Sequence, residues 1–148
     1  YITAVAAIEV FKYPIFGFII KKYGVIPIIR QKIRKAIGSL NLAEKAIKNG
    51  ISFLISPEGT RTLNGEIGSF KKGPFHLAKN TNVTIVPIAL KGGFKAKKKS
   101  DWRVQPGILT VVFGEPIENS QFSTLSVKDL GELVRNRIVE LKNGDLKK

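Results

Sequence analysis

The sequence contains no cysteine and no methionine, and it has a single histidine, His76. Without cysteine there is no disulfide framework and no thiolate zinc site, which fits a reducing compartment without establishing one. Because the chain has no methionine and begins at Tyr1, we expect it to be a piece of a longer protein. A motif that is absent from this sequence is therefore not excluded from the part of the protein that precedes Tyr1.

Acidic residues are also scarce. Eleven Asp and Glu stand against 25 Lys and Arg, which gives a formal net charge of +14. Such an excess attracts phosphates of nucleic acid, anionic lipid headgroups or phosphorylated substrates, and charge alone does not choose among them. Long apolar runs are missing too, since stretches such as residues 15–20 fall well short of the ~20 residues that cross a bilayer. No transmembrane helix and no signal peptide are predicted.

What the sequence does contain is an alternation of helical and strand patterns in 148 residues with 43% hydrophobic content, enough for one globular domain with a core. The first segment, 4–23, predicts two short helices or one helix kinked at Pro14. Further helices are predicted over 31–48, ended by the stop signal Asn49-Gly50, over 73–80, and over 127–141, with Ser126 as the cap. Strands are predicted over 25–29, 51–55, 83–90 and 108–113, and a glycine- and lysine-rich loop over 91–100. This order predicts an α/β domain with a mixed, mostly parallel central sheet flanked by helices.

The most informative stretch is Ser56-Pro57-Glu58-Gly59-Thr60-Arg61, which follows an apolar strand directly. Proline removes a backbone donor, glycine permits a tight turn, and the guanidinium of Arg61 offers a planar fork of donors that suits a phosphate. We expect the loop to hold an anion. The alternative is a surface turn stabilised by its own ion pair between Glu58 and Arg61.

Two other predicted strands carry an arginine or a proline at or near their carboxyl ends. Arg30 follows the predicted strand 25–29, and Val86-Pro87 lies within the strand 83–90. Ligands of open α/β sheets settle at the carboxyl ends of strands, so we expect these ends and the loop to form one pocket. Read alone, Arg30 could equally be a solvated charge at a strand end, and the proline only a bend.

These blocks, in this order, resemble the glycerolphosphate acyltransferase family, to which the lysophosphatidic acid acyltransferases belong. Gly24 to Arg30 is similar to the block that ends in a substrate-binding arginine, Ser56 to Arg61 to the Pro-Glu-Gly-Thr-Arg block, and Val86 to Leu90 to the final apolar block. Residues 70–78 also resemble the family's connecting helix. The resemblance extends from about Ala4 to Leu90.

The chain departs from the family pattern in places. Ser56 stands where phenylalanine is frequent, and Ile29 stands where an acidic residue is common. The family's first block, a histidine followed five positions later by aspartate, is absent, because Thr81 lies five positions after His76. We expect that catalytic pair upstream of Tyr1, and we expect residues 1–148 to be a single acyltransferase domain without its N-terminal part. His76 is expected to pack or bond near the core.

The resemblance implies transfer of a fatty acyl group from acyl-CoA or acyl carrier protein to the free hydroxyl of 1-acyl-glycerol-3-phosphate, giving phosphatidic acid. It places substrate binding on Arg30, Glu58, Gly59, Thr60 and Arg61, and gives Val86 and Pro87 an acyl-pocket or structural role. No catalytic residue in this chain, no metal and no cofactor are implied. Another lysophospholipid or glycerol-3-phosphate as acceptor stays open, as does a non-catalytic lipid-binding relative.

The sequence also suggests partners. The first segment mixes aromatic and aliphatic residues with Lys12, Lys21 and Lys22, which suits a lipid interface, although a buried helix pair explains it nearly as well. With the resemblance, this predicts association with an anionic membrane surface on the cytoplasmic face. The run Lys95 to Lys99 is either a solvated loop or an attractor of anionic lipid or of an acidic acyl carrier. Nucleic acid is disfavoured, because no exposed aromatics are interleaved with the basic residues.

Overall fold

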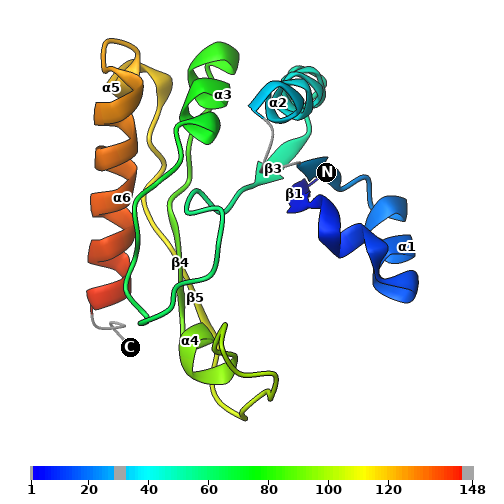
Figure 1. The fold of residues 1–148 in the computed structure, drawn as a ribbon. Helices are drawn as coiled ribbons and strands as arrows, with labels where there is room; N and C mark the ends of the chain where they lie inside the picture. The colour runs from blue at the N-terminus through cyan, green and yellow to red at the C-terminus, as the bar shows by residue number, and fades with distance from the viewer. Residues whose placement is uncertain (1, 29–32, 145–148) are drawn as a thin grey trace. The chain divides into compact units, whose positions relative to one another are not determined.

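The computed structural model describes residues 2–28 and 33–144, and the chain forms two compact units, Tyr1–Ile55 and Ser56–Lys148 (Figure 1). Each unit has its own small sheet. Strands pair in parallel in the first unit and antiparallel in the second, with helices between them, so the predicted α/β class is confirmed. One central sheet through both units and a single domain over 1–148 stay predictions.

The first unit is built on a three-stranded parallel sheet in the order β2-β1-β3. Its strands are β1 (Ile2–Ala7), β2 (Ile26–Ile28) and β3 (Ser52–Leu54). Its helices are the 3₁₀ helix η1 (Ile8–Lys12), α1 (Pro14–Lys22) and α2 (Ile33–Lys48). Parallel strands need crossover connections, which these helices supply.

Strand β1 corrects the sequence prediction, because residues 4–7 were expected to be helical and instead form the centre of the sheet. The alanines of this segment favour a helix, but hydrogen bonding to β2 on one side and β3 on the other outweighs that preference. The helical part of the prediction is confirmed by α1, which has Pro14 in its first turn and ends before Gly24, whose φ is +66°.

The other elements of the first unit agree with the prediction. Helix α2 ends at Lys48, and Gly50 has a φ of +80°, which a residue with a side chain rarely adopts. The proline-containing strand β2 lies at an edge of the sheet. Thr3 is buried, and its hydroxyl donates to the carbonyls of Tyr23 at 3.3 Å and Gly24 at 3.0 Å, which fixes the turn before β2.

The second unit pairs β4 (Ile88–Lys91) with β5 (Thr110–Phe113) and packs β4 against α6 (Val127–Asn143). Its other helices are α3 (Gly73–Thr81), α4 (Gly93–Ala96) and α5 (Asn119–Phe122). The core consists of five buried side chains: Phe75, Ile117, Phe122, Leu130 and Val134. A Cβ on Gly131 would lie 3.3 Å from the ring of Phe75, so glycine lets α6 approach α3 closely (Figure 1).

Both predicted strands of this unit begin later than expected, since the strand expected over 108–113 begins at Thr110, and two short helices were not predicted. The strand expected over 83–90 begins only at Ile88, because before it residue 85 makes just one isolated bridge, to Ile117, and Pro87 has no N–H to donate. The loop expected over 91–100 contains the short helix α4, and α5 was not predicted. None of the helices within residues 2–28 and 33–144 has the length and apolar character that spanning a membrane requires.

The start of α6 confirms the predicted cap. The hydroxyl of Ser126 accepts a hydrogen bond from the backbone N–H of Asp129 at 3.1 Å and donates to its carboxylate at 2.7 Å. We expect Ser126→Ala to lower the free energy of unfolding by about 1 kcal/mol, because a helix N–H loses its partner. Urea denaturation measures this. Ser120→Ala, an exposed serine in α5, is the control, and an equal loss in both variants would contradict the cap.

Candidate functional site

The stretch from Ser56 to Arg61 begins with a turn that backbone hydrogen bonds hold in place. The N–H of Gly59 donates to the carbonyl of Ser56 at 3.1 Å, and Gly59 has a φ of +69°, which only glycine adopts without strain. The N–H of Lys71 donates to the carbonyl of Pro57 at 2.8 Å. The loop is therefore tied to the segment that leads into α3.

The carboxylate of Glu58 is used inside this loop. Its Oε2 accepts a hydrogen bond from the backbone N–H of Gly68 at 2.9 Å. The described part of the chain has no ion pair between Glu58 and Arg61, so the alternative of a turn closed by that pair finds no support. Glu58 shapes the loop by binding its far end at Gly68, and it makes no ion pair with the guanidinium of Arg61, although it is the acidic residue nearest to Arg61 in the sequence.

Thr60 and Arg61 are exposed at the end of the turn. The hydroxyl of Thr60 accepts a hydrogen bond from Lys99 Nζ at 3.0 Å. Among the described residues, the guanidinium of Arg61 has neither a hydrogen-bond partner nor an ion-pair partner. An unpaired, solvent-accessible guanidinium can offer two parallel N–H donors to a phosphate.

The remaining predicted site residues are placed less directly. Arg30 lies outside the described residues, so its meeting with Arg61 stays a prediction. Val86 is 45% exposed, whereas Pro87 is fully buried and its carbonyl accepts from Gly114 N–H at 2.8 Å. Pro87 lines an open hollow of about 290 Å³ together with Lys91, Val112, Gly114, Glu115, Arg137, Glu140, Leu141 and Gly144. The burial of Pro87 supports its structural role.

His76 corrects a prediction. It was expected to pack or bond near the core, but it is exposed on α3. Its neighbours Phe75 and Leu77 are the buried residues, and together with Ala78 they take the face of the helix that meets the core. Nor do His, Asp and Glu side chains gather into a group of three that could hold a metal, as far as the structure describes the chain.

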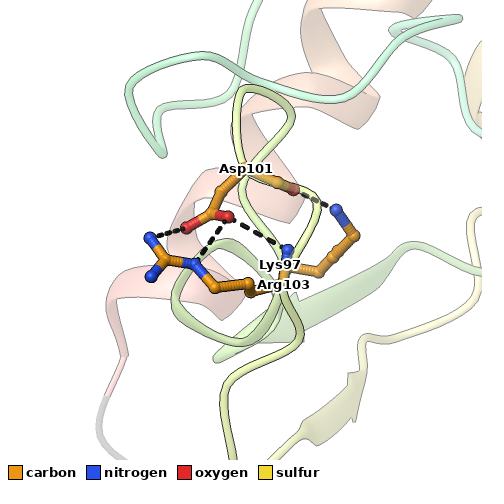
Figure 2. Close-up of polar contacts among 3 residues, drawn as sticks. All are labelled: Lys97, Asp101 and Arg103. Carbon is orange, nitrogen blue, oxygen red and sulfur yellow. Dashed lines mark hydrogen bonds and ion pairs between the residues drawn. The ribbon is translucent and has the colours of Figure 1, made fainter.

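A polar network in the loop between β4 and β5 was missed by the sequence reasoning (Figure 2). The carboxylate of Asp101 accepts from Arg103 Nε at 3.1 Å, from its Nη2 at 3.2 Å and from its backbone N–H at 3.0 Å. Lys97 Nζ donates to the backbone carbonyl of Asp101. The sequence does contain a signal for this network, because Asp101 is the single acidic residue in a loop that is otherwise rich in lysine and arginine.

The network acts on the acidity of Asp101. Hydrogen bonds from the side chain and the backbone of Arg103 hold the pKa of Asp101 below its ordinary value of 3.8, and the charges of Lys97 and Lys98 act in the same direction. Because the folded pKa is depressed, the network stabilises the loop at every pH above 3.8, and that contribution is lost only as the pH falls through the lowered pKa. Asp101 therefore stays ionised near neutral pH and keeps accepting the hydrogen bonds of Arg103 there.

The sequence of this site places the chain among known proteins. Residues 1–91, which include the whole loop from Ser56 to Arg61, match the protein family described as Acyltransferase. The chain belongs to the acyltransferase family. The match ends one residue after Leu90, where the resemblance was expected to end, and the family prediction is confirmed.

Similar acyltransferases are found in plants and bacteria. The chain is 36% identical over 117 residues to the 1-acyl-sn-glycerol-3-phosphate acyltransferase LPAT1, chloroplastic, of Arabidopsis thaliana, covering 78% of this chain and 33% of the relative. It is 32% identical over 139 residues to the 1-acyl-sn-glycerol-3-phosphate acyltransferase of Cocos nucifera, covering 93% and 45%. The chain thus spans less than half the length of these two relatives.

A solved acyltransferase has the same fold. The crystal structure of the 1-acyl-sn-glycerophosphate acyltransferase PlsC from Thermotoga maritima matches with a TM-score of 0.76 and 28% identity, covering 98% of this chain and 58% of that one. The match includes the part of the chain beyond the family region, where α6 and the Asp101 network lie. The α/β acyltransferase fold therefore extends through both units of the chain.

Proposed function

We propose that this chain is the substrate-binding part of an enzyme that transfers a fatty acyl group to the free hydroxyl of 1-acyl-glycerol-3-phosphate, giving phosphatidic acid. The observation that carries the proposal is the unpaired guanidinium of Arg61 in a loop whose acid, Glu58, is held by Gly68. The names of the relatives, which are 1-acyl-sn-glycerol-3-phosphate acyltransferases, support this acceptor.

In this proposal the chain binds and orients the acceptor. Arg61 binds the phosphate through charge-assisted hydrogen bonds, and Gly59 and Thr60 shape the wall of the site. The resemblance implies that Arg30 also binds substrate. Holding the phosphate fixes the position of the glycerol hydroxyl, which turns a bimolecular encounter into a step within one complex. The loss of orientation would therefore slow the reaction even where the chemical groups are intact.

The chemical step needs a base, which we assign to the His-Asp pair expected upstream of Tyr1. The histidine takes the proton of the free hydroxyl, and the oxygen attacks the carbonyl carbon of the acyl thioester. The new ester bond forms, the carbon–sulfur bond breaks, and the thiolate leaves and takes up the proton. No acyl-enzyme forms, so no serine or cysteine nucleophile is needed. Acyl-CoA or acyl carrier protein serves as donor, and neither a cofactor nor a metal takes part.

Helix α1 suits a lipid surface. Its exposed apolar side chains include Ile15, 77% exposed, and Phe18, 69% exposed, and they lie beside Lys12, Lys21 and Lys22. Apolar side chains next to lysines match the boundary between acyl chains and anionic headgroups. The proposal therefore includes contact of α1 with an anionic membrane on the cytoplasmic face, where a lipid acceptor is available.

A vesicle experiment tests the α1 contact. We expect the double variant Ile15→Ser/Phe18→Ser to bind phosphatidylglycerol-containing vesicles about tenfold more weakly, because two apolar side chains no longer enter the lipid. Co-sedimentation of the purified protein measures the binding. The control is Leu42→Ser in α2, an aliphatic residue that is exposed in the same unit. Equal binding by the double variant and the control would contradict the contact.

The catalytic proposal is tested with the natural full-length protein and a labelled acyl donor. The enzyme is given one acceptor at a time: 1-acyl-glycerol-3-phosphate, glycerol-3-phosphate or 1-acyl-glycerophosphocholine. We expect the fastest incorporation of label with 1-acyl-glycerol-3-phosphate, which gives labelled phosphatidic acid. Faster acylation of glycerol-3-phosphate or of the choline lipid would overturn the proposed acceptor. Parallel reactions with acyl-CoA and acylated carrier protein identify the donor.

A further inference from the structure

A second loop reaches the candidate site from a distant part of the chain. The Nζ atom of Lys99, in the connection between β4 and β5, lies 3.0 Å from the hydroxyl oxygen of Thr60 and donates to it. Thr60 directly precedes Arg61, so the contact brings a second cation to the residue next to the unpaired guanidinium. Nothing in the Pro-Glu-Gly-Thr-Arg block itself predicts this lysine.

The two loops also touch at another point. A Cβ on Gly65 would lie 3.0 Å from Cδ1 of Phe94, the aromatic residue of α4. Gly65 has a φ of +88°, so glycine is required there both by the backbone and by the ring. Two separate contacts, Lys99 with Thr60 and Phe94 with Gly65, therefore hold the second loop against the segment 60–65.

The neighbours of Lys99 are engaged elsewhere. Lys97 donates to the carbonyl of Asp101, and Lys98 Nζ lies 5.8 Å from the ring centroid of Phe94. Asp101 is bound by Arg103 and braces the loop just after Lys99 (Figure 2). An ammonium group has three donors, and Lys99 uses one of them on Thr60, so two remain for a ligand.

We propose that Lys99 is a further binding residue for the phosphate group of the acceptor, acting beside Arg61. This rests on the proposed function. Arg61 follows Thr60 in the chain and Lys99 donates to the Thr60 hydroxyl, so an arginine and a lysine gather at this residue. The two can share one phosphate, the arginine through its planar fork and the lysine as a point charge. Thr60 then serves to position the ammonium group rather than to act on the substrate.

The test compares Lys99→Ala with Lys95→Ala in the natural full-length protein. Lys95 lies on the same loop and is exposed, so the two variants lose the same charge but only one loses the contact with Thr60. We expect Lys99→Ala to raise the KM for 1-acyl-glycerol-3-phosphate by about tenfold, as for one lost charge-assisted hydrogen bond, with the KM for the acyl donor unchanged. Lys99→Arg should restore most of the affinity.

A second readout does not depend on turnover. Inorganic phosphate should raise the melting temperature of the wild type and of Lys95→Ala but not of Lys99→Ala, because only a binding-competent site is stabilised by the ligand. If Lys99→Ala and Lys95→Ala behave alike in both measurements while Arg61→Ala is impaired, Lys99 has no role and the proposed function stands. A different outcome is that neither the wild type nor any variant acylates the lipid, while phosphate still raises the melting temperature of the wild type but not of Lys99→Ala. In that case the proposed acceptor is wrong and the phosphate site at Lys99 is supported.

Discussion

Arg61→Ala is expected to lower kcat/KM for 1-acyl-glycerol-3-phosphate by about 100-fold, which corresponds to the loss of two parallel charge-assisted hydrogen bonds to one phosphate. The effect is expected to be large because the guanidinium has no partner among the described residues that could already have satisfied it. Steady-state kinetics with the lipid acceptor varied at a saturating acyl donor measure the change.

Two variants make this result specific. Arg61→Lys keeps the charge but loses the planar fork, so it should recover only part of the rate. Arg137→Ala removes an exposed arginine of α6 that pairs with Glu140 at 3.5 Å, and it should leave the kinetics unchanged. A full rate in Arg61→Ala would remove this residue from the site, whereas an equal loss in Arg137→Ala would show that net charge alone is responsible.

Leu130→Ala is expected to lower the free energy of unfolding by about 2–5 kcal/mol, because it removes apolar contacts and leaves a cavity in a packed core. Leu130 is 0% exposed and packs with Phe75, Phe122 and Ile117. These side chains come from α3, α5, α6 and the segment before α5, so a cavity here loosens the packing of most of the second unit.

Chemical denaturation of Leu130→Ala is best compared with Leu63→Ala. The same atoms are removed in both, but Leu63 is 73% exposed, so its loss should change stability by less than about 0.5 kcal/mol. A change of similar size in the two variants would contradict the assignment of the core to the contact between α3 and α6.

Local patterns predicted most of the helices. The apolar spacing between 31 and 48, the stop signal at Asn49-Gly50 and the cap at Ser126 are short-range features, and the structure confirms them in α2 and α6. These elements are encoded within a few turns of sequence, because helix hydrogen bonds and caps join residues three or four positions apart.

The errors came from contacts between distant segments. Residues 4–7 of β1 were predicted to be helical, but pairing with β2 and β3 makes them a strand. His76 was predicted to lie near the core, but Phe75 and Leu77 occupy the buried face of α3. Pairing partners that lie far apart in the chain leave no local signal.

In the candidate site, too, the local features were predicted and the contacts between distant segments were not. Arg61, Gly59 and Thr60 were predicted from one continuous block, but the partner of Glu58 proved to be Gly68, and the lysine on Thr60 comes from 39 residues away. The residue types of a loop indicate which ligand the loop can bind. They do not indicate which distant loop will contact it, because that depends on the three-dimensional path of the chain.

The central claim, that this chain belongs to an enzyme that transfers an acyl group by general-base catalysis, is tested most directly by reading the coding sequence upstream of Tyr1. The account predicts a histidine followed five positions later by aspartate in the same reading frame. A complete reading frame without that pair would contradict catalysis by this mechanism, and phosphate or lipid binding would then be the function that the site at Arg61 supports.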